Sequence, residues 1–149
     1  MRIGELLSGK ARKFLILPLE CPVNEAVERM AQQGVEAAVV ADAHRPVGMF
    51  SGPDLLRFLQ TKTAEALQSA ALGEAMSDRF VVVSPEEEIR PVLAKMLDGG
   101  IRQLVVASGD KVLGQLPLCE IVKKMFDILD NEVRHLNDYI ADLHEAGMD

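Results

Sequence analysis

The sequence predicts an α/β (α+β) protein in which two βαββα repeats pack with pseudo-twofold symmetry and a C-terminal amphipathic helix follows. The first observation is that the chain aligns with itself at an offset of 66 residues, so that Met30 meets Met96 and Gly34 meets Gly100. The second is that both halves carry the same order of apolar runs, glycines and turn residues. Two copies, rather than the three or more of a solenoid, favour a pair of halves that close one core together.

The strands of each repeat are predicted from short apolar runs bounded by turn residues. In the second copy, the first run is Phe80-Val81-Val82-Val83, whose β-branched side chains favour a buried strand. A helix that closes each repeat is expected from about Pro53 and from about Leu118. We expect the strands at residues 14–17, 37–41 and 47–50 in the first repeat and at residues 80–83, 104–107 and 113–116 in the second.

The first helix of each repeat carries apolar residues at helical spacing. It ends at a glycine, Gly34 or Gly100, because glycine readily adopts the left-handed conformation found at helix C-termini. In the second repeat we expect Ser84 to cap this helix, with Pro85 at its first position and Glu87 completing a capping box.

Composition limits the class of protein. Apolar residues make up 48% of the 149 residues and aromatic residues only 4%, so the core must be aliphatic. The net charge of −7 argues against nucleic-acid binding, because an acidic chain repels a phosphate backbone. No run approaches the roughly 18–20 apolar residues of a membrane span, and no targeting segment is recognised, so we expect a soluble cytoplasmic protein. Cys21 and Cys119 are expected to be reduced, mostly buried thiols.

The sequence contains no recognisable catalytic set. His44, His135 and His144 are scattered, and neither cysteine has a nearby histidine that would activate it. We find no glycine-rich phosphate loop, nucleophile elbow or metal-ligand spacing. The expectation is a protein that is not an enzyme and that carries no metal and no cofactor.

The repeat unit, the element order and three short runs together resemble a tandem pair of CBS (cystathionine β-synthase) domains, also called a Bateman module. The runs are Ser84-Pro85 before the helix that contains Met96, the segment from Gly100 to Val106, and the segment from Gly48 to Asp54. The resemblance covers roughly residues 1–126. It divides the chain into CBS repeat 1 at residues 1–66, CBS repeat 2 at residues 67–126 and a heptad-patterned helix at residues 127–149.

The resemblance implies a regulatory function. Proteins of this family bind an adenosine-containing ligand, usually AMP, ADP, ATP or S-adenosylmethionine, in the cleft between two repeats. With no effector domain fused to the pair, the output would act in trans on a separate protein. The alternative is a non-catalytic dimerisation or interaction scaffold whose pocket has degenerated.

The resemblance also implies a set of ligand-binding residues. A ribose diol favours a carboxylate that accepts two hydrogen bonds, and Asp54 lies at the expected position, with Ser51 placed to cap the last helix or to contact a phosphate. Alternatively, Ser51 and Asp54 form only a helix cap. Arg102 is expected to contact phosphate or, alternatively, to be an exposed strand residue paired with a carboxylate. The second half of the pocket would consist of Met76, Asp78, Arg79, Phe80, Val81 and Val82.

The second copy departs from this pattern. Pro117 stands where the first copy has Ser51, and Glu120 stands where it has Asp54. A second site would use Lys13, Phe14 and Glu120, and we expect one good nucleotide site or none. The basic run that ends at Lys13 is either a solvated loop or a phosphate contact.

The C-terminal segment repeats apolar residues at alternating steps of four and three. This is a heptad spacing held for about three heptads, which favours a coiled coil and hence a homodimer. Packing back on the repeats and docking on the regulated partner are the alternatives. The residues of this seam are Val122, Phe126, Leu129, Val133, Leu136, Ile140 and Leu143.

Overall fold

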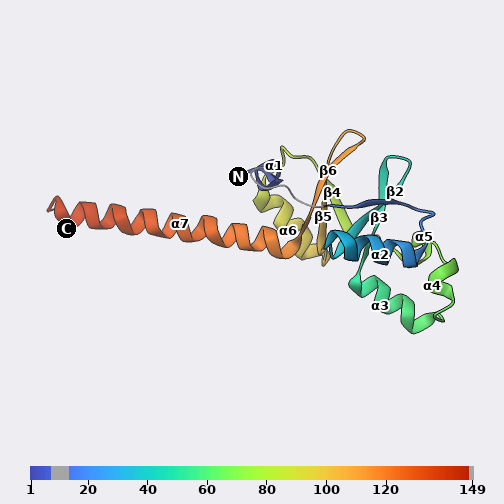
Figure 1. Cartoon of the computed structure of the whole chain (residues 1–149). Helices are drawn as coiled ribbons and strands as arrows, with labels where there is room; N and C mark the ends of the chain where they lie inside the picture. The colour runs from blue at the N-terminus through green and yellow to red at the C-terminus, as the bar shows by residue number, and fades with distance from the viewer. Residues whose placement is uncertain (8–13, 148–149) are drawn as a thin grey trace.

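The computed structural model describes residues 1–7 and 14–147 of the chain (Figure 1). The first half contains α1 (Ile3–Leu7), β1 (Ile16–Pro18), α2 (Val23–Gln33), β2 (Ala37–Asp42), β3 (Arg45–Ser51) and α3 (Gly52–Thr61). The second half contains α4 (Ala66–Ser69), α5 (Leu72–Ala75), β4 (Phe80–Val83), α6 (Ile89–Gly99), β5 (Gln103–Ser108), β6 (Lys111–Pro117) and α7 (Leu118–Glu145). The predicted order of strand, helix, strand, strand and helix is confirmed in both halves.

The two halves form sheets of the same topology. Each sheet has three strands, in the orders β1-β2-β3 and β4-β5-β6, with a parallel first pair and an antiparallel second pair. Even the irregularity in the antiparallel pair recurs, between Val40 and Ala41 in one sheet and between Val106 and Ala107 in the other. The internal repeat is therefore a repeat of structure, and the predicted α/β fold class is confirmed.

Each of the short helices α1 and α5 packs into the core of the opposite repeat. Ile3 of α1 is fully buried in the core of the second repeat, and its backbone N–H donates to the carbonyl of Glu87 at 2.8 Å. In the equivalent contact, Leu72 of α5 is buried in the core of the first repeat and donates to the carbonyl of Cys21 at 2.8 Å. The two cores thus cross the sequence boundary expected between residues 66 and 67.

A third apolar cluster lies between the two sheets. Ala37, Val39 and Met49 of the first sheet are buried against Val105 and Val112 of the second. The side chains of two aromatic residues, Phe14 and Phe80, pack at the margin of this cluster. Because one cluster draws on both sheets, the halves face each other, and their two hairpin turns lie near one another at one end of the molecule (Figure 1).

The helix after Ser84 starts later than the sequence predicts. Its first residue is Ile89, preceded by Glu88 in an extended conformation. Only half of the expected capping box is present: the Ser84 N–H donates to Glu87 Oε2 at 2.7 Å, but the Glu87 N–H donates to the Ser84 backbone carbonyl at 3.2 Å and not to its hydroxyl. They close a turn instead of a helix, because a bridge between Arg2 and Glu88 keeps the chain extended up to residue 88.

One further expectation needs correction, and one alternative for the C-terminal helix can be examined. Cys21 is buried, but Cys119 is exposed near the start of α7, and both thiols are free. The alternative in which the heptad-patterned helix packs back on the repeats is not seen along its whole length: α7 packs on the second repeat through Ile121, then projects from the body and ends far from it (Figure 1). Across the described ranges, no helix has the length and apolar character that crossing a membrane requires.

Candidate functional site

Asp54 lies at the beginning of α3, where β3 ends. Its side chain is buried, with 4% of its surface exposed, although it is a charged residue. The backbone N–H and the hydroxyl of Ser51 both donate to Asp54 Oδ2, at 2.9 and 2.8 Å. Arg57, one turn further along α3, forms an ion pair with Asp54 Oδ1. Asp54 therefore completes a capping box on α3, as one of the two sequence interpretations required.

The carboxylate of Asp54 has limited remaining capacity. A carboxylate oxygen offers two lone-pair positions, so Oδ2 is occupied by the two donors of Ser51, whereas Oδ1 accepts, among the described residues, only from Arg57. The Arg57 side chain is 64% exposed, so it can leave this contact without a large desolvation cost. A ligand hydroxyl could then reach Oδ1 while the cap on Oδ2 stays intact.

The linker that precedes β4 lies beside the end of β3. Met49 and Ser77 exchange two backbone hydrogen bonds, each 2.8 Å long, which join the first half of the chain to the second. Met76 lies so close to Gly48 that a Cβ at position 48 would overlap the Met76 side chain. Because Ser51 follows Met49 on the same strand by only two residues, this bridge brings the linker close to the cap of α3.

The residues expected on the second half of the pocket differ in whether their side chains are exposed and could contact a ligand. Asp78 and Arg79 are exposed, and the Arg79 N–H donates to Ser77 Oγ at 3.1 Å. Phe80 is half-buried against the cluster between the sheets, whereas Val81 packs against the core of the second repeat. Val81 could thus offer only its backbone to a ligand, and Val82, which is 47% exposed, projects from the opposite face of β4.

Arg102 lies beside this segment because β4 and β5 are parallel neighbours. The register pairs Phe80 with Gln103, so Arg102 precedes the residue opposite Phe80. Its side chain is exposed, and within the described part of the chain no carboxylate forms a salt bridge with it. Its backbone carbonyl accepts from the Leu118 N–H at 2.8 Å. Within the described residues, Arg102 is therefore exposed without a carboxylate partner, and its contact with phosphate stays a prediction.

The equivalent site in the second copy differs physically. Pro117 occupies the position before α7 and has no hydroxyl to donate, and Glu120 is exposed where Asp54 is buried. Phe14 is half-buried against the cluster between the sheets, as Phe80 is. Lys13 lies outside the described residues.

Three residues with roles near this site were missed by the sequence interpretation. Arg57 is three residues after Asp54 on a helix, a spacing that brings the two side chains together and could have been recognised. Ser77 carries the backbone bridge, which depends on topology and leaves no side-chain signal. Gln115 donates from its side-chain amide to the carbonyl of Ala37, the residue paired with Ser51. It aligns with the apolar Met49, so a polar residue at an apolar repeat position was the available signal.

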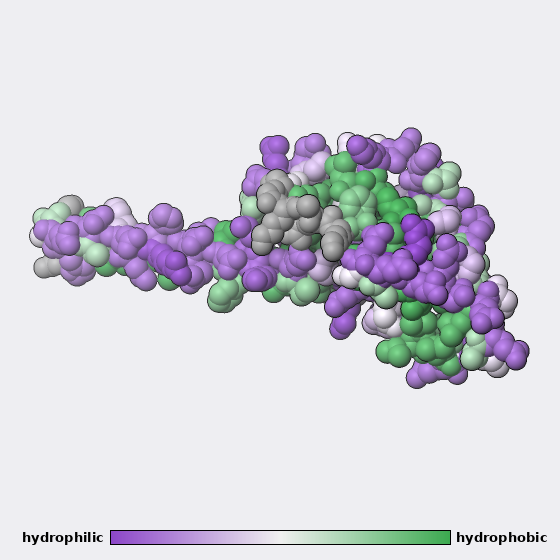
Figure 2. All heavy atoms as spheres, in the orientation of Figure 1, coloured by the Kyte–Doolittle hydropathy of each residue, from purple (hydrophilic) through white to green (hydrophobic). Residues whose placement is uncertain are grey.

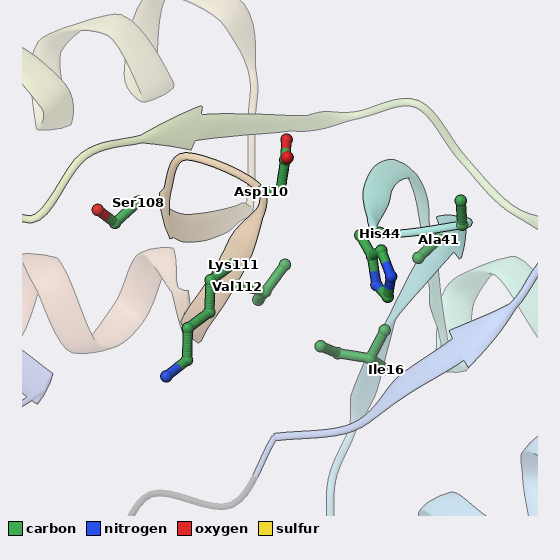
Figure 3. A pocket seen from close by; sticks show the side chains of 8 residues that line it. Ile16, Ala41, His44, Ser108, Asp110, Lys111 and Val112 are labelled. Atoms are coloured by element: carbon green, nitrogen blue, oxygen red, sulfur yellow. The ribbon is translucent and has the colours of Figure 1, made fainter.

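A pocket of about 450 Å³ lies elsewhere, between the two hairpin turns (Figure 3). Ile16, Val112 and the His44 ring point toward one another across it. None of the predicted ligand-binding residues that the structure describes lines it, so it is separate from the site around Asp54. The lining residues are Ile16, Ala41, Ala43, His44, Ser108, Asp110, Lys111 and Val112.

Comparison with known proteins identifies relatives of this architecture. The family described as CBS domain matches residues 4–61 and again residues 72–127. The mitochondrial CBS domain-containing protein CBSX3 of Arabidopsis thaliana is 25% identical over 147 residues, covering 93% of this chain and 71% of that protein.

Solved structures show the same fold. The CBS-domain containing protein ATU1752 from Agrobacterium tumefaciens has a TM-score of 0.72 at 22% identity, covering 84% of this chain and 99% of that one. The CBS domain protein PAE2072 from Pyrobaculum aerophilum, solved in complex with AMP, has a TM-score of 0.67 at 22% identity, covering 80% and 89%. At this identity the structural likeness establishes the fold alone.

Proposed function

Since the chain belongs to the CBS domain family, we propose that it is a non-catalytic regulatory module that binds an adenosine-containing ligand between its two repeats. The observation that carries the proposal is the buried carboxylate of Asp54 beside a linker from the opposite repeat. The AMP complex of the Pyrobaculum aerophilum relative supports this class of ligand. AMP, ADP, ATP and S-adenosylmethionine are the candidates.

In the proposed complex, each part of the ligand meets a matching group. A ribose hydroxyl donates to Asp54 Oδ1 after the exposed Arg57 has moved away, and the freed guanidinium then faces the ligand phosphate. Arg102, which is exposed and unpaired within the described residues, supplies a second cation. The half-buried side chains of Met76 and Phe80 supply apolar surface for the base.

Signalling follows from the position of the site between the repeats. The ligand would contact α3 of one repeat and the linker of the other, so its binding energy depends on their relative orientation. A ligand that fits one orientation better shifts the population toward it. We propose that a separate regulated protein recognises this orientation, so that the module signals in trans.

Isothermal titration calorimetry with AMP, ADP, ATP and S-adenosylmethionine tests the proposal. We expect one of the four to bind with a stoichiometry of one per chain. Asp54→Asn should abolish this binding, because an amide nitrogen or a weakened acceptor replaces the ribose-binding carboxylate. Glu120→Gln is the matched control at the equivalent position and should leave binding unchanged. Equal losses in both variants, with their melting temperatures unchanged, would contradict a single site.

A second candidate function is a scaffold without a ligand. The observation that favours it is that both Asp54 oxygens already have protein donors. In this case none of the four compounds would raise the melting temperature of the wild-type protein, as a ligand specific for the folded state must.

The proposal includes an assembly and a location. We propose that the module works as a homodimer in the cytoplasm, where free thiols such as Cys21 and Cys119 stay reduced. Light scattering of the purified protein and imaging of a C-terminally tagged chain test the two statements. Residence in an organelle, as the name of the Arabidopsis thaliana relative states for that protein, would contradict the second.

A further inference from the structure

The long helix α7 exposes an apolar stripe along its length. Six residues of the heptad seam are large apolar side chains with between 44% and 69% of their surface exposed. On the face that Figure 2 shows, the projecting part of α7 is largely hydrophilic, with hydrophobic side chains along one edge. The exposed seam residues are Val122 (44%), Phe126 (69%), Leu129 (45%), Val133 (54%), Leu136 (62%) and Ile140 (50%).

Only the first half of α7 belongs to the second repeat. Ile121 is fully buried in its core, and Leu118 and Met125 pack against that core on the same side of the helix. An ion pair of 3.5 Å between Arg90 of α6 and Glu132 marks how far the contact with the body extends along α7. The following residues, 133–145, are all exposed apart from the partly covered Leu143.

A helical extension of this kind gains little stability of its own in water. Residues 133–145 span about 20 Å at a rise of about 1.5 Å per residue. Isolated helices shorter than about 12–15 residues are marginal even when they are rich in alanine, and most helices in proteins depend on the burial of an apolar face. The seam must therefore be covered for this half of α7 to hold its conformation.

We propose that the seam is covered by α7 of a second copy of this chain, in a parallel two-stranded coiled coil. The alternating steps of four and three match the knobs-into-holes packing of two like helices, which makes the seam complementary to itself. The inference deepens the proposed homodimer by naming its contact and direction, and it is independent of the ligand.

The residue types in the seam favour the parallel two-stranded form. With Leu129, Leu136 and Leu143 at the d positions of the heptad, the a positions are Phe126, Val133 and Ile140. Val133 and Ile140, two of the three a residues, are β-branched, and β-branched residues at a together with leucine at d favour parallel dimers over larger assemblies.

The charges that flank the seam agree with this direction. In a parallel pair, a residue at position g approaches the e position five residues later on the other helix. Glu132 then faces Asn137, and Tyr139 faces His144 of the second copy, so no two like charges meet. An antiparallel pair centred on the seam would bring the Glu132 side chains of both copies together near its middle.

The covered surface is of the size at which specific interfaces begin. Seven seam side chains from each helix would together remove about 1,000 Å² from water, which is near the lower bound of specific protein interfaces. The parallel direction places both second repeats at the same end of the coiled coil. The repeats of one copy then lie near the repeats of the other, so a change in their relative orientation in one copy occurs close to the second copy.

Disulfide cross-linking determines the direction. Ile140→Cys in a Cys119→Ser background should cross-link to itself under mild oxidation, because parallel helices place equal residue numbers opposite each other. Leu143→Cys with the natural Cys119 distinguishes the antiparallel form, in which residue 143 approaches residue 119 of the other copy. Peptide mapping that finds a 119–143 cross-link would overturn the parallel direction and leave the homodimer standing.

Light scattering with a matched pair of variants tests the seam. Ile140→Asp introduces a charge into the contact and should raise the dimer dissociation constant at least about a hundredfold. Ala141→Asp adds the same charge at the b position, outside the seam, and should leave the dimer unchanged. Melting of the repeats should be the same in both variants, because neither residue touches the body. A wild-type monomer, or a dimer that withstands Ile140→Asp, would overturn the proposal, and neither result bears on ligand binding.

Discussion

The side-chain amide of Gln115 on β6 donates a hydrogen bond of 2.7 Å to the backbone carbonyl of Ala37 on β2, joining the sheets of the two repeats directly. The same amide has a buried oxygen, Gln115 Oε1, without a hydrogen-bond partner within the described part of the chain. One residue thus carries both a bond between the halves and an unsatisfied polar atom.

Gln115 gives the first prediction. Gln115→Ala should lower the free energy of unfolding by about 1–3 kcal/mol, because it leaves the Ala37 carbonyl without its donor and opens a cavity. Gln115→Met loses the same donor but fills the space and removes the unpartnered oxygen, so it should cost less than Gln115→Ala. Urea denaturation measures both variants. A larger loss for Met than for Ala would contradict this assignment.

The cap of α3 gives the second prediction. Ser51→Ala removes the hydroxyl that donates to Asp54 Oδ2 and should lower the free energy of unfolding by about 1 kcal/mol. Ser69→Ala is the control, because Ser69 is exposed at the end of α4. Thermal melting followed by circular dichroism should show a lower transition for Ser51→Ala only; equal transitions would mean that the hydroxyl does not stabilise the cap.

The close approach of α1 to the turn at Pro85 gives the third prediction. A Cβ at Gly4 would lie 2.9 Å from the Cβ of Pro85 and 3.1 Å from its carbonyl oxygen, and neither atom can move easily. Gly4→Ala should therefore destabilise the protein by about 1–3 kcal/mol through overpacking. Gly52→Ala, at a position with open space, should be neutral within about 0.5 kcal/mol. Chemical denaturation that finds the two variants alike would show that α1 shifts to accommodate the methyl group.

The two cysteines give the fourth prediction. Burial raises the pKa of the Cys21 thiol, the nearby Glu25 raises it further and Arg29 acts in the opposite sense. A raised pKa means a smaller thiolate fraction at a given pH, so Cys21 should react slowly with a maleimide at neutral pH and faster as the pH rises. Stopped labelling and mass spectrometry of Cys119→Ser and Cys21→Ser variants should show that the exposed Cys119 reacts first. Equal rates would contradict the burial of Cys21.

The repeat pattern was sufficient to predict the elements of the fold. Gly34 and Gly100 end their helices with φ values of 67° and 63°, as expected from glycine after an apolar helical stripe. The predicted start of α6 at Ser84 was wrong, because the turn that forms there uses the same residue types as a helix cap. Local patterns cannot separate these outcomes, since the deciding contact between Arg2 and Glu88 joins segments far apart in the sequence.

The candidate site was predictable only in part. Asp54 and Ser51 belong to a recognisable local motif, and the structure does join them. The burial of Asp54 and the bridge from Met49 to Ser77 depend on how the halves dock, which no single segment encodes. Whether these residues bind a nucleotide stays a prediction.

Because α1 and α5 each complete the core of the other repeat, the two repeats should fold as one cooperative unit. A fragment ending at residue 66 would keep Ile3 but lose the core that buries it, and would lack Leu72, which fills its own core. Neither half should therefore fold on its own. If the chain is cleaved between the halves, the two fragments should refold only when they associate with each other.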